Sequence, residues 1–140
     1  MKNEKGITIL ALVFVIIIML AIGGFAFYYG KKLIHKAELE NIKTDMISIK
    51  TRAKTIVDEY NIKELETLKG VKIEDQELLN KLSIEEGYIW NRETLDEQEL
   101  KNIDGDKYIV KYNLENSNDC EVYYKDGFDG EYSLTQLIEK

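Results

Sequence analysis

ITILALVFVIIIMLAIGGFAFYY, residues 7–29, is a run of 23 residues without a charged side chain. An α-helix of this length rises about 35 Å, which is enough to cross a hydrocarbon core of about 30 Å. Aromatic residues gather at its far end, between Phe25 and Tyr29, as they do in the interfacial belt of membrane proteins. We therefore expect a transmembrane helix that begins at Ile7 and ends at Tyr29.

A short charged leader, residues 1–6 (MKNEKG), precedes this run and ends in Gly6. An ordinary secretory signal fits poorly, because its apolar region is shorter and is followed by a small-residue cleavage site. A buried helix of a soluble protein also fits poorly, since the rest of the chain is too small and too charged to cover the run on all sides. The leader and the run together predict insertion into a membrane.

An apolar stripe continues beyond the membrane segment, in residues 30–60, with spacings that alternate between three and four. This period predicts a helix with one apolar face, and no glycine or proline interrupts residues 31–69. We expect the stripe to pack on a distal domain; a parallel coiled-coil stalk is the alternative. The opposite face, with Lys43, Asp45, Lys50 and other charged residues, is expected to be solvated. The stripe comprises Leu39, Ile42, Met46, Ile49, Ala53, Ile56 and Tyr60.

The distal domain, residues 61–140, alternates short helical and strand patterns. The turn pair Lys69-Gly70 is expected to close the helical region. Capping-box spacings at Thr94–Glu97 and Ser133–Gln136 predict two helix starts, the first helix reaching about residue 103. The pattern predicts an α+β fold: one long N-terminal helix, half transmembrane and half soluble, packed on a small antiparallel sheet. The expected segments are a helix in 73–82, strands at 87–91, 108–112 and 121–125, and turns at 104–106, 126–127 and 129–130.

The charge of the chain is −7, but residues 61–140 hold ten basic and twenty acidic side chains, a net charge of −10. An acidic domain repels phosphate backbones, so we expect no general nucleic-acid binding. No Ser/His/Asp set, nucleotide loop or Cys/His cluster occurs, and His35 and Cys120 are single residues of their kinds. Asp-Gly pairs near 104–106 and 126–130 lack the twelve-residue calcium loop and are explained by turn chemistry. We expect no enzyme activity, no metal site and no cofactor.

The stretch Lys5-Gly6-Ile7-Thr8-Ile9-Leu10-Ala11-Leu12-Val13 resembles the class III signal of type IV pilins and pseudopilins. The sequence of this stretch most resembles that of pilin-like proteins of Gram-positive bacteria. The C-terminal part of the chain is similar to theirs as well, in residues 105–112, 121–124 and 132–134. The resemblance implies cleavage between Gly6 and Ile7 by a prepilin peptidase and N-methylation of Ile7. It also implies that the apolar helix later packs among those of other pilin-like subunits in a filament.

Two features separate the chain from a major pilin. Most of the family carries a glutamate at the position of Ala11, where it is thought to neutralise the amino terminus of a neighbouring subunit, and the chain has no proline to kink its helix. These differences favour a minor pilin or pseudopilin of a type IV filament, secretion system or DNA-uptake pseudopilus. Its partners would be the membrane and, indirectly, an assembly platform and its ATPase. Its distal domain would lie outside the cytoplasm, at the cell surface.

The alternative is a single-pass anchored binding protein with an acidic extracellular domain and no filament role. The flanking charges complicate the orientation: Lys31, Lys32 and Lys36 follow the apolar run, whereas Lys2 and Lys5 before it are offset by one glutamate. For a plain signal anchor, the positive-inside rule would favour a cytoplasmic distal domain. The Gly6 motif indicates a dedicated export route instead.

Overall fold

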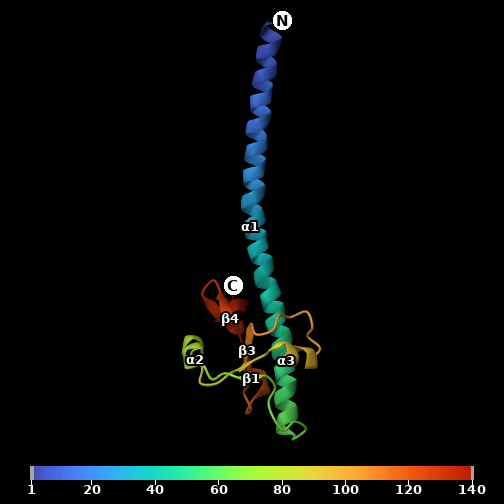
Figure 1. Ribbon diagram of the computed structural model, residues 1–140, viewed down its shortest axis with the longest axis vertical. Helices are drawn as coiled ribbons and strands as arrows, with labels where there is room; N and C mark the ends of the chain where they lie inside the picture. Colours follow the sequence, from blue (N-terminus) through green and yellow to red (C-terminus); the bar gives the residue numbers. More distant parts are fainter. Residues whose placement is uncertain (1, 140) are drawn as a thin grey trace. The chain divides into compact units, whose positions relative to one another are not determined.

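The computed structural model describes residues 2–139, with side chains from residue 6 to residue 139. Met1 and the side chains of residues 2–5, which carry most of the expected leader, lie outside the described part. The chain divides into two compact units, an N-terminal unit (Met1–Glu38) and a head unit (Leu39–Lys140). The elements, coloured along the chain in Figure 1, are α1 (Lys2–Asn61), β1 (Val71–Lys72), α2 (Gln76–Leu82), β2 (Tyr88–Ile89), α3 (Arg92–Glu97), β3 (Tyr108–Lys111), η1 (Ser117–Asp119), β4 (Glu121–Phe128), β5 (Glu131–Ser133) and α4 (Leu134–Ile138).

Helix α1 runs without a break from Lys2 to Asn61. It ends eight residues before the expected turn at Lys69-Gly70. Lys63 adopts a left-handed backbone (φ 65°), its amide donates to the Tyr60 carbonyl, and the amide of Glu64 donates to the carbonyl of Glu59. This pairing is a Schellman motif, which ends a helix by satisfying its last carbonyl groups. The position usually holds glycine, so the lysine concealed the helix end in the sequence.

The head unit contains a five-stranded sheet in the order β1-β2-β3-β4-β5, and all neighbouring strands are antiparallel. In the central pair, Ile109 lies opposite Tyr123 and Val110 opposite Val122. β-branched and aromatic residues suit such a pleated, buried surface. The predicted α+β fold, a long helix packed with a small antiparallel sheet, is confirmed. The two edge strands, β1 and β5, were not expected from the sequence, because each has only two or three residues.

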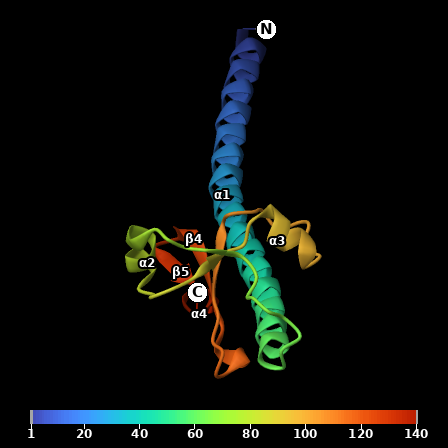
Figure 2. The same ribbon diagram turned by 60° about the horizontal axis from the view of Figure 1, so that its bottom comes forward.

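Each face of the sheet covers a separate core. Tyr108, Val110 and Val122 pack in one cluster with the stripe of α1, whereas Ile109 joins a second cluster with Leu79 of α2. Figures 1 and 2 show the strands of the head unit between α2 and the last third of α1. Because side chains alternate along a strand, one strand supplies both cores. The head unit therefore takes residues 39–61 of α1 as a core element.

The expected helix start at Thr94 is wrong. α3 begins at Arg92, and Asn91 is its N-cap: the Asn91 Oδ1 accepts from the Thr94 amide at 2.9 Å and from the Thr94 hydroxyl at 2.8 Å. Asparagine is a stronger N-cap than threonine, so the upstream residue prevails. The helix also ends at Glu97 rather than near residue 103, because Glu99 turns left-handed (φ 62°) and the chain leaves the helix there.

The expected turn at residues 126–127 is also wrong. Both residues lie inside β4, where the pairing with β5 shifts register between Tyr123 and Phe128. Gly127 has a φ of 75°, and a Cβ there would lie 2.6 Å from the Tyr132 ring. The Asp-Gly signal therefore marks a bulge in a long strand, and the turn follows at Asp129 and Gly130.

Candidate functional site

The expected cleavage boundary lies within α1. Gly6 is exposed, and a Cβ at this position would meet no atom within 4 Å, so the structure imposes no local requirement for glycine here. Ile7, the expected new amino-terminal residue, is 66% exposed. Ala11, at the family's glutamate position, is also exposed. Gly6, Ile7 and Ala11 are therefore accessible to another molecule.

The expected transmembrane segment is fully helical, and every side chain from Gly6 to Tyr29 is exposed. By length and apolar composition, α1 is able to cross a membrane. At its far end the Tyr28 and Tyr29 rings meet edge to face, with centroids 5.7 Å apart. The Lys31 ammonium lies 4.6 Å from the centre of the Phe27 ring. Apolar surface of this extent on a protein needs a cover, and a bilayer provides one of the right thickness.

The stripe residues that follow lie under the sheet of the head unit. Those from Ile42 to Ile56 are buried, and Leu39 packs against them at the edge of the core. Tyr60, the last of the stripe, is half-buried. The fully buried Val57 was missed because it breaks the alternation of three and four, although it follows Ala53 by one helical turn. The stripe is thus covered by its own chain, as the packing interpretation expected, and is not free for a coiled-coil stalk.

The opposite face of α1 in the head unit carries hydroxyl groups at its centre. The prediction that Asp45 is solvated on this face is wrong, because Asp45 is half-buried and contacts the sheet. Thr44, Ser48, Thr51 and Thr55 each donate a hydrogen bond to the carbonyl four residues earlier, at 2.8 to 3.2 Å. Such bonds use up the hydroxyl hydrogen within the helix. Ile47 lies among them and is 49% exposed. This face therefore presents small groups and methyls rather than a continuous charged surface.

A polar contact fastens α1 to the sheet. The Tyr108 hydroxyl donates to the Asp45 carboxylate at 3.0 Å. Burial raises the pKa of Asp45, the hydrogen bond from Tyr108 counteracts this, and the nearby charge of Asp104 adds to the rise. Burial, followed by the charge of Asp45, raises the pKa of Tyr108 far above its usual range. The phenol thus stays protonated and remains a donor to the helix.

A second polar chain lies inside the head core. The Trp90 indole Nε1 donates to the Tyr112 hydroxyl at 3.1 Å, and that hydroxyl donates to the Lys69 carbonyl at 2.6 Å. Trp90 is fully buried, so its N–H needs this acceptor. Burial raises the pKa of Tyr112 above its usual range. These two hydrogen bonds link the loop after α1 to the residues that directly follow β2 and β3, so they are structural contacts.

The residues whose side chains are able to support chemistry do not form a cluster. Cys120 is buried, its sulfur accepts from the Asn113 amide at 3.5 Å, and burial raises the pKa of its thiol. A raised pKa lowers the fraction of reactive thiolate. Within the described residues, no group of three or more His, Cys, Asp or Glu side chains could hold a metal ion. Asp106 and Asp129 lie in turns, as their sequence context indicated, and Asp104 directly precedes one.

No family model, no curated protein and no solved structure matches the chain.

Proposed function

We propose that the chain is a minor pilin-like subunit of a type IV filament or pseudopilus, cleaved after Gly6 and N-methylated at Ile7. The observation that carries the proposal is the boundary at these two residues. A charged leader ends in glycine, and an apolar helix long enough for a membrane begins with the next residue. A peptidase that cuts at this boundary would release a subunit whose first residue is already apolar.

The arrangement of α1 supports the same proposal. Its first part exposes apolar side chains all round, whereas its last part buries only one face, against the sheet of the same chain. A helix of this kind has a membrane-soluble portion and a portion already tied to a folded domain. Leaving the bilayer would require other apolar helices to cover the first portion, and neighbouring subunits could supply them.

Assembly would therefore be mechanical rather than enzymatic. The subunit would exchange lipid contacts for helix–helix contacts, a change with little net driving force of its own. An assembly platform and a cytoplasmic ATPase would supply the work, and the head unit would stay outside the cytoplasm. Ala11 leaves no carboxylate to pair with a neighbour's amino terminus, which favours a position at low copy number rather than the repeating core of the filament.

The second candidate is an anchored binding protein with an extracellular head unit and no filament role, and the charges beside the span bear on its orientation. Lys31, Lys32 and Lys36 lie on the side that the positive-inside rule keeps in the cytoplasm. A plain signal anchor with these charges would keep the leader and place the head unit inside the cell. The two candidates therefore differ in the mass of the mature chain, and a plain signal anchor differs from both in the side on which the head unit lies.

Intact-mass and N-terminal analysis of the protein from its host separates the candidates. The pilin proposal expects a mature chain that begins at N-methylated Ile7, and it expects Gly6→Val to leave the leader in place. Gly30→Val is the matched control, because a Cβ there also meets no atom within 4 Å and the residue lies outside the motif. Wild-type protein that keeps its leader in the membrane, or a head unit that intact cells shield from protease, would refute the proposal.

A further inference from the structure

The water-facing end of the expected membrane span carries a compact set of polar and basic side chains. The apolar run ends at Tyr29, and Lys31 and Lys32 follow within one helical turn. Residues 29–36 rise about 10 Å along the helix. The headgroup layer of a bilayer is about 5–7 Å thick on each side, so these side chains fall at the level of lipid phosphates. All of them belong to the N-terminal unit.

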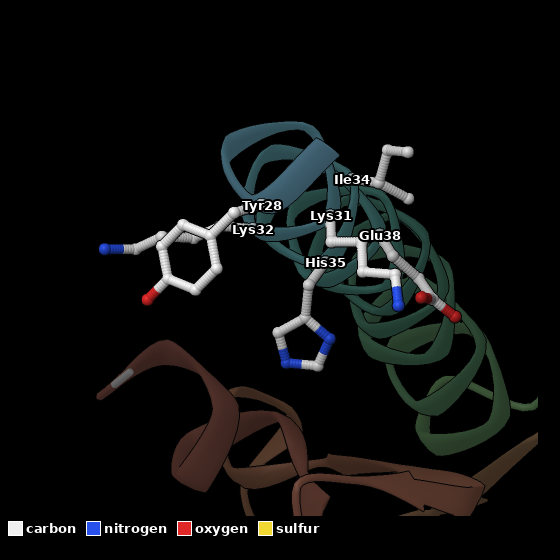
Figure 3. Close-up of a pocket in the computed structure, with 6 residues that line it drawn as sticks. All are labelled: Tyr28, Lys31, Lys32, Ile34, His35 and Glu38. Carbon is white, nitrogen blue, oxygen red and sulfur yellow. The ribbon is translucent and has the colours of Figure 1, made fainter. Parts of the chain in front are cut away.

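Several of these side chains surround one hollow on one side of α1. The hollow is lined by Tyr28, Lys31, Lys32, Ile34, His35 and Glu38. Figure 3 shows the Tyr28 phenol and the Lys32 ammonium extending together, with the His35 ring between them and the Lys31 side chain. Two ammonium groups and a phenol are hydrogen-bond donors to a phosphate, and they outnumber the single carboxylate, that of Glu38.

The position of Lys31 directs this charge toward the membrane. Its ammonium lies 4.6 Å from the centre of the Phe27 ring, one turn back along the helix. The cation–π contact holds the stem of Lys31 along the last turn of the apolar segment. The basic hollow therefore borders the hydrocarbon region directly instead of extending into water.

A second hollow, this one apolar, adjoins the first. It is lined by Leu20, Ala21, Gly24, Phe25 and Tyr28, so Tyr28 belongs to both hollows. Gly24 and Ala21 leave space on this face, and a Cβ at Gly24 would meet no atom within 4 Å. The residues of the two hollows recur at three- and four-residue spacings and so share one face of the helix. One face thus offers a shallow apolar depression followed by a cluster of cations.

We propose that this face binds an anionic phospholipid, with its phosphate among Tyr28, Lys31 and Lys32 and an acyl chain over Ala21 and Gly24. An amphipathic, negatively charged molecule matches both hollows, whereas free phosphate would match only one. The site holds for a pilin-like subunit and for an anchored protein alike, because it needs only the membrane-embedded state. With the head unit outside the cytoplasm, the positive-inside rule does not account for the lysines on this side of the span. Binding of an anionic lipid gives them a role there.

The test uses the full-length chain in phosphatidylcholine bilayers that contain spin-labelled phosphatidylglycerol or spin-labelled phosphatidylcholine. Electron spin resonance measures the fraction of each lipid that is immobilised beside the protein. We expect phosphatidylglycerol to be preferred, and Lys32→Gln to reduce the preference by up to about fivefold, the contribution of one lysine near a charged surface. Lys36→Gln is the matched control, since it makes the same charge change outside the hollow and should leave most of the preference intact.

Two further arms test the lipid as the occupant. Gly24→Leu fills the apolar hollow and should release phosphatidylglycerol, whereas Gly30→Leu, which lies outside both hollows, should not. Inorganic phosphate should compete no better than chloride at equal ionic strength. Equal losses in Lys32→Gln and Lys36→Gln would mean diffuse attraction without a site and would overturn the proposal. The absence of any preference, or specific displacement by inorganic phosphate, would overturn it as well.

Discussion

At the scale of single residues, the head unit depends on two tyrosine hydroxyl groups that form hydrogen bonds with buried or half-buried polar groups. The Tyr112 hydroxyl both accepts from the Trp90 indole and donates to the Lys69 carbonyl. The Tyr108 hydroxyl reaches the Asp45 carboxylate on α1. Neither role was evident in the sequence, because a tyrosine in a strand pattern indicates only a ring that packs. Which of its atoms meets a partner depends on residues 22 to 63 positions away.

The Tyr112→Phe variant tests the internal polar chain. Removing the hydroxyl leaves a buried indole N–H without its acceptor, which costs about 1–3 kcal/mol of unfolding free energy. Denaturant unfolding followed by circular dichroism measures the loss. Tyr88→Phe is the control: its ring packs edge to face on Tyr112 at 5.3 Å, but the Trp90–Tyr112–Lys69 chain stays intact. A loss in Tyr88→Phe as large as that in Tyr112→Phe would contradict the assignment.

The tyrosines also predict a stability that declines in alkali. Burial raises the pKa of Tyr108, Tyr112 and Tyr123 in the folded head unit, whereas in the unfolded chain tyrosine ionises near pH 10. Above that pH the unfolded state holds fewer protons than the folded state, so rising pH favours unfolding. Thermal melts from about pH 9 to pH 11 measure the slope. In Tyr108→Phe, the decline of the unfolding free energy with pH should be shallower, by an amount equivalent to up to about one proton. An unchanged decline would count against the role of Tyr108.

Glu99 presents a stability test of a different kind. Its φ of 62° places it in the left-handed region at the end of α3, where the Leu100 amide bonds the Leu95 carbonyl. Glu99→Gly should stabilise the head unit by about 0.5–1 kcal/mol. This gain is the backbone strain that glycine relieves, reduced by the greater conformational freedom that glycine gives the unfolded chain. Glu99→Ala removes the same charge but keeps the strain, so it should change stability little. Equal effects of the two variants would point to charge rather than to backbone strain.

At the scale of elements, periodicity was a reliable guide and helix ends were not. The stripe from Ile42 to Ile56 packs where its spacing indicated, because burial of a helical face follows directly from the sequence period. The end of α1 was misplaced because Lys63 occupies a site that normally signals itself with glycine. The start of α3 was misplaced because the sequence offers two capping residues three positions apart, Asn91 and Thr94, and the helix uses Asn91. Short edge strands leave too few residues to show alternation, so only pairing partners reveal them.

The stripe of α1 has a close internal control. Ile49 is fully buried under the sheet, whereas Ile47, two residues earlier, is 49% exposed on the other face. Ile49→Ala should cost about 2–5 kcal/mol through lost burial and a cavity. Ile47→Ala should change the unfolding free energy by less than about 0.5 kcal/mol. Similar losses in both variants would mean that α1 does not pack on the sheet by this face.

At the scale of the whole molecule, the two units have different sources of stability. Both core clusters lie between Ile42 and Leu137, within the head unit. In the N-terminal unit every side chain from Gly6 to Tyr29 is exposed, so its environment must supply the cover. The sequence indicated this division through its apolar run and acidic distal part. The candidate site could be inferred only in outline, since hydropathy locates a span but not the hollows on one of its faces.

A chain reduced to residues 39–140 should therefore fold without a membrane. It keeps every buried residue of both clusters and all five strands. We expect a monomer in aqueous buffer with a single cooperative thermal transition, as is usual for a small domain. Circular dichroism and sedimentation measure these properties. A chain that starts at residue 62 lacks the α1 part of the core and should not fold. Cooperative folding of that shorter chain would show that α1 is dispensable to the head.

The one tryptophan of the chain, Trp90, is fully buried and borders the Tyr112 ring. The head unit therefore carries its own optical reporter: an indole in a dry, tyrosine-rich setting emits at shorter wavelength than one in water and is shielded from dissolved quenchers. The apolar segment, residues 7–29, contains no tryptophan, so tryptophan emission would follow the head unit alone. In a vesicle or in an assembled fibre, the wavelength of that emission would report whether the head unit is folded, without an added label.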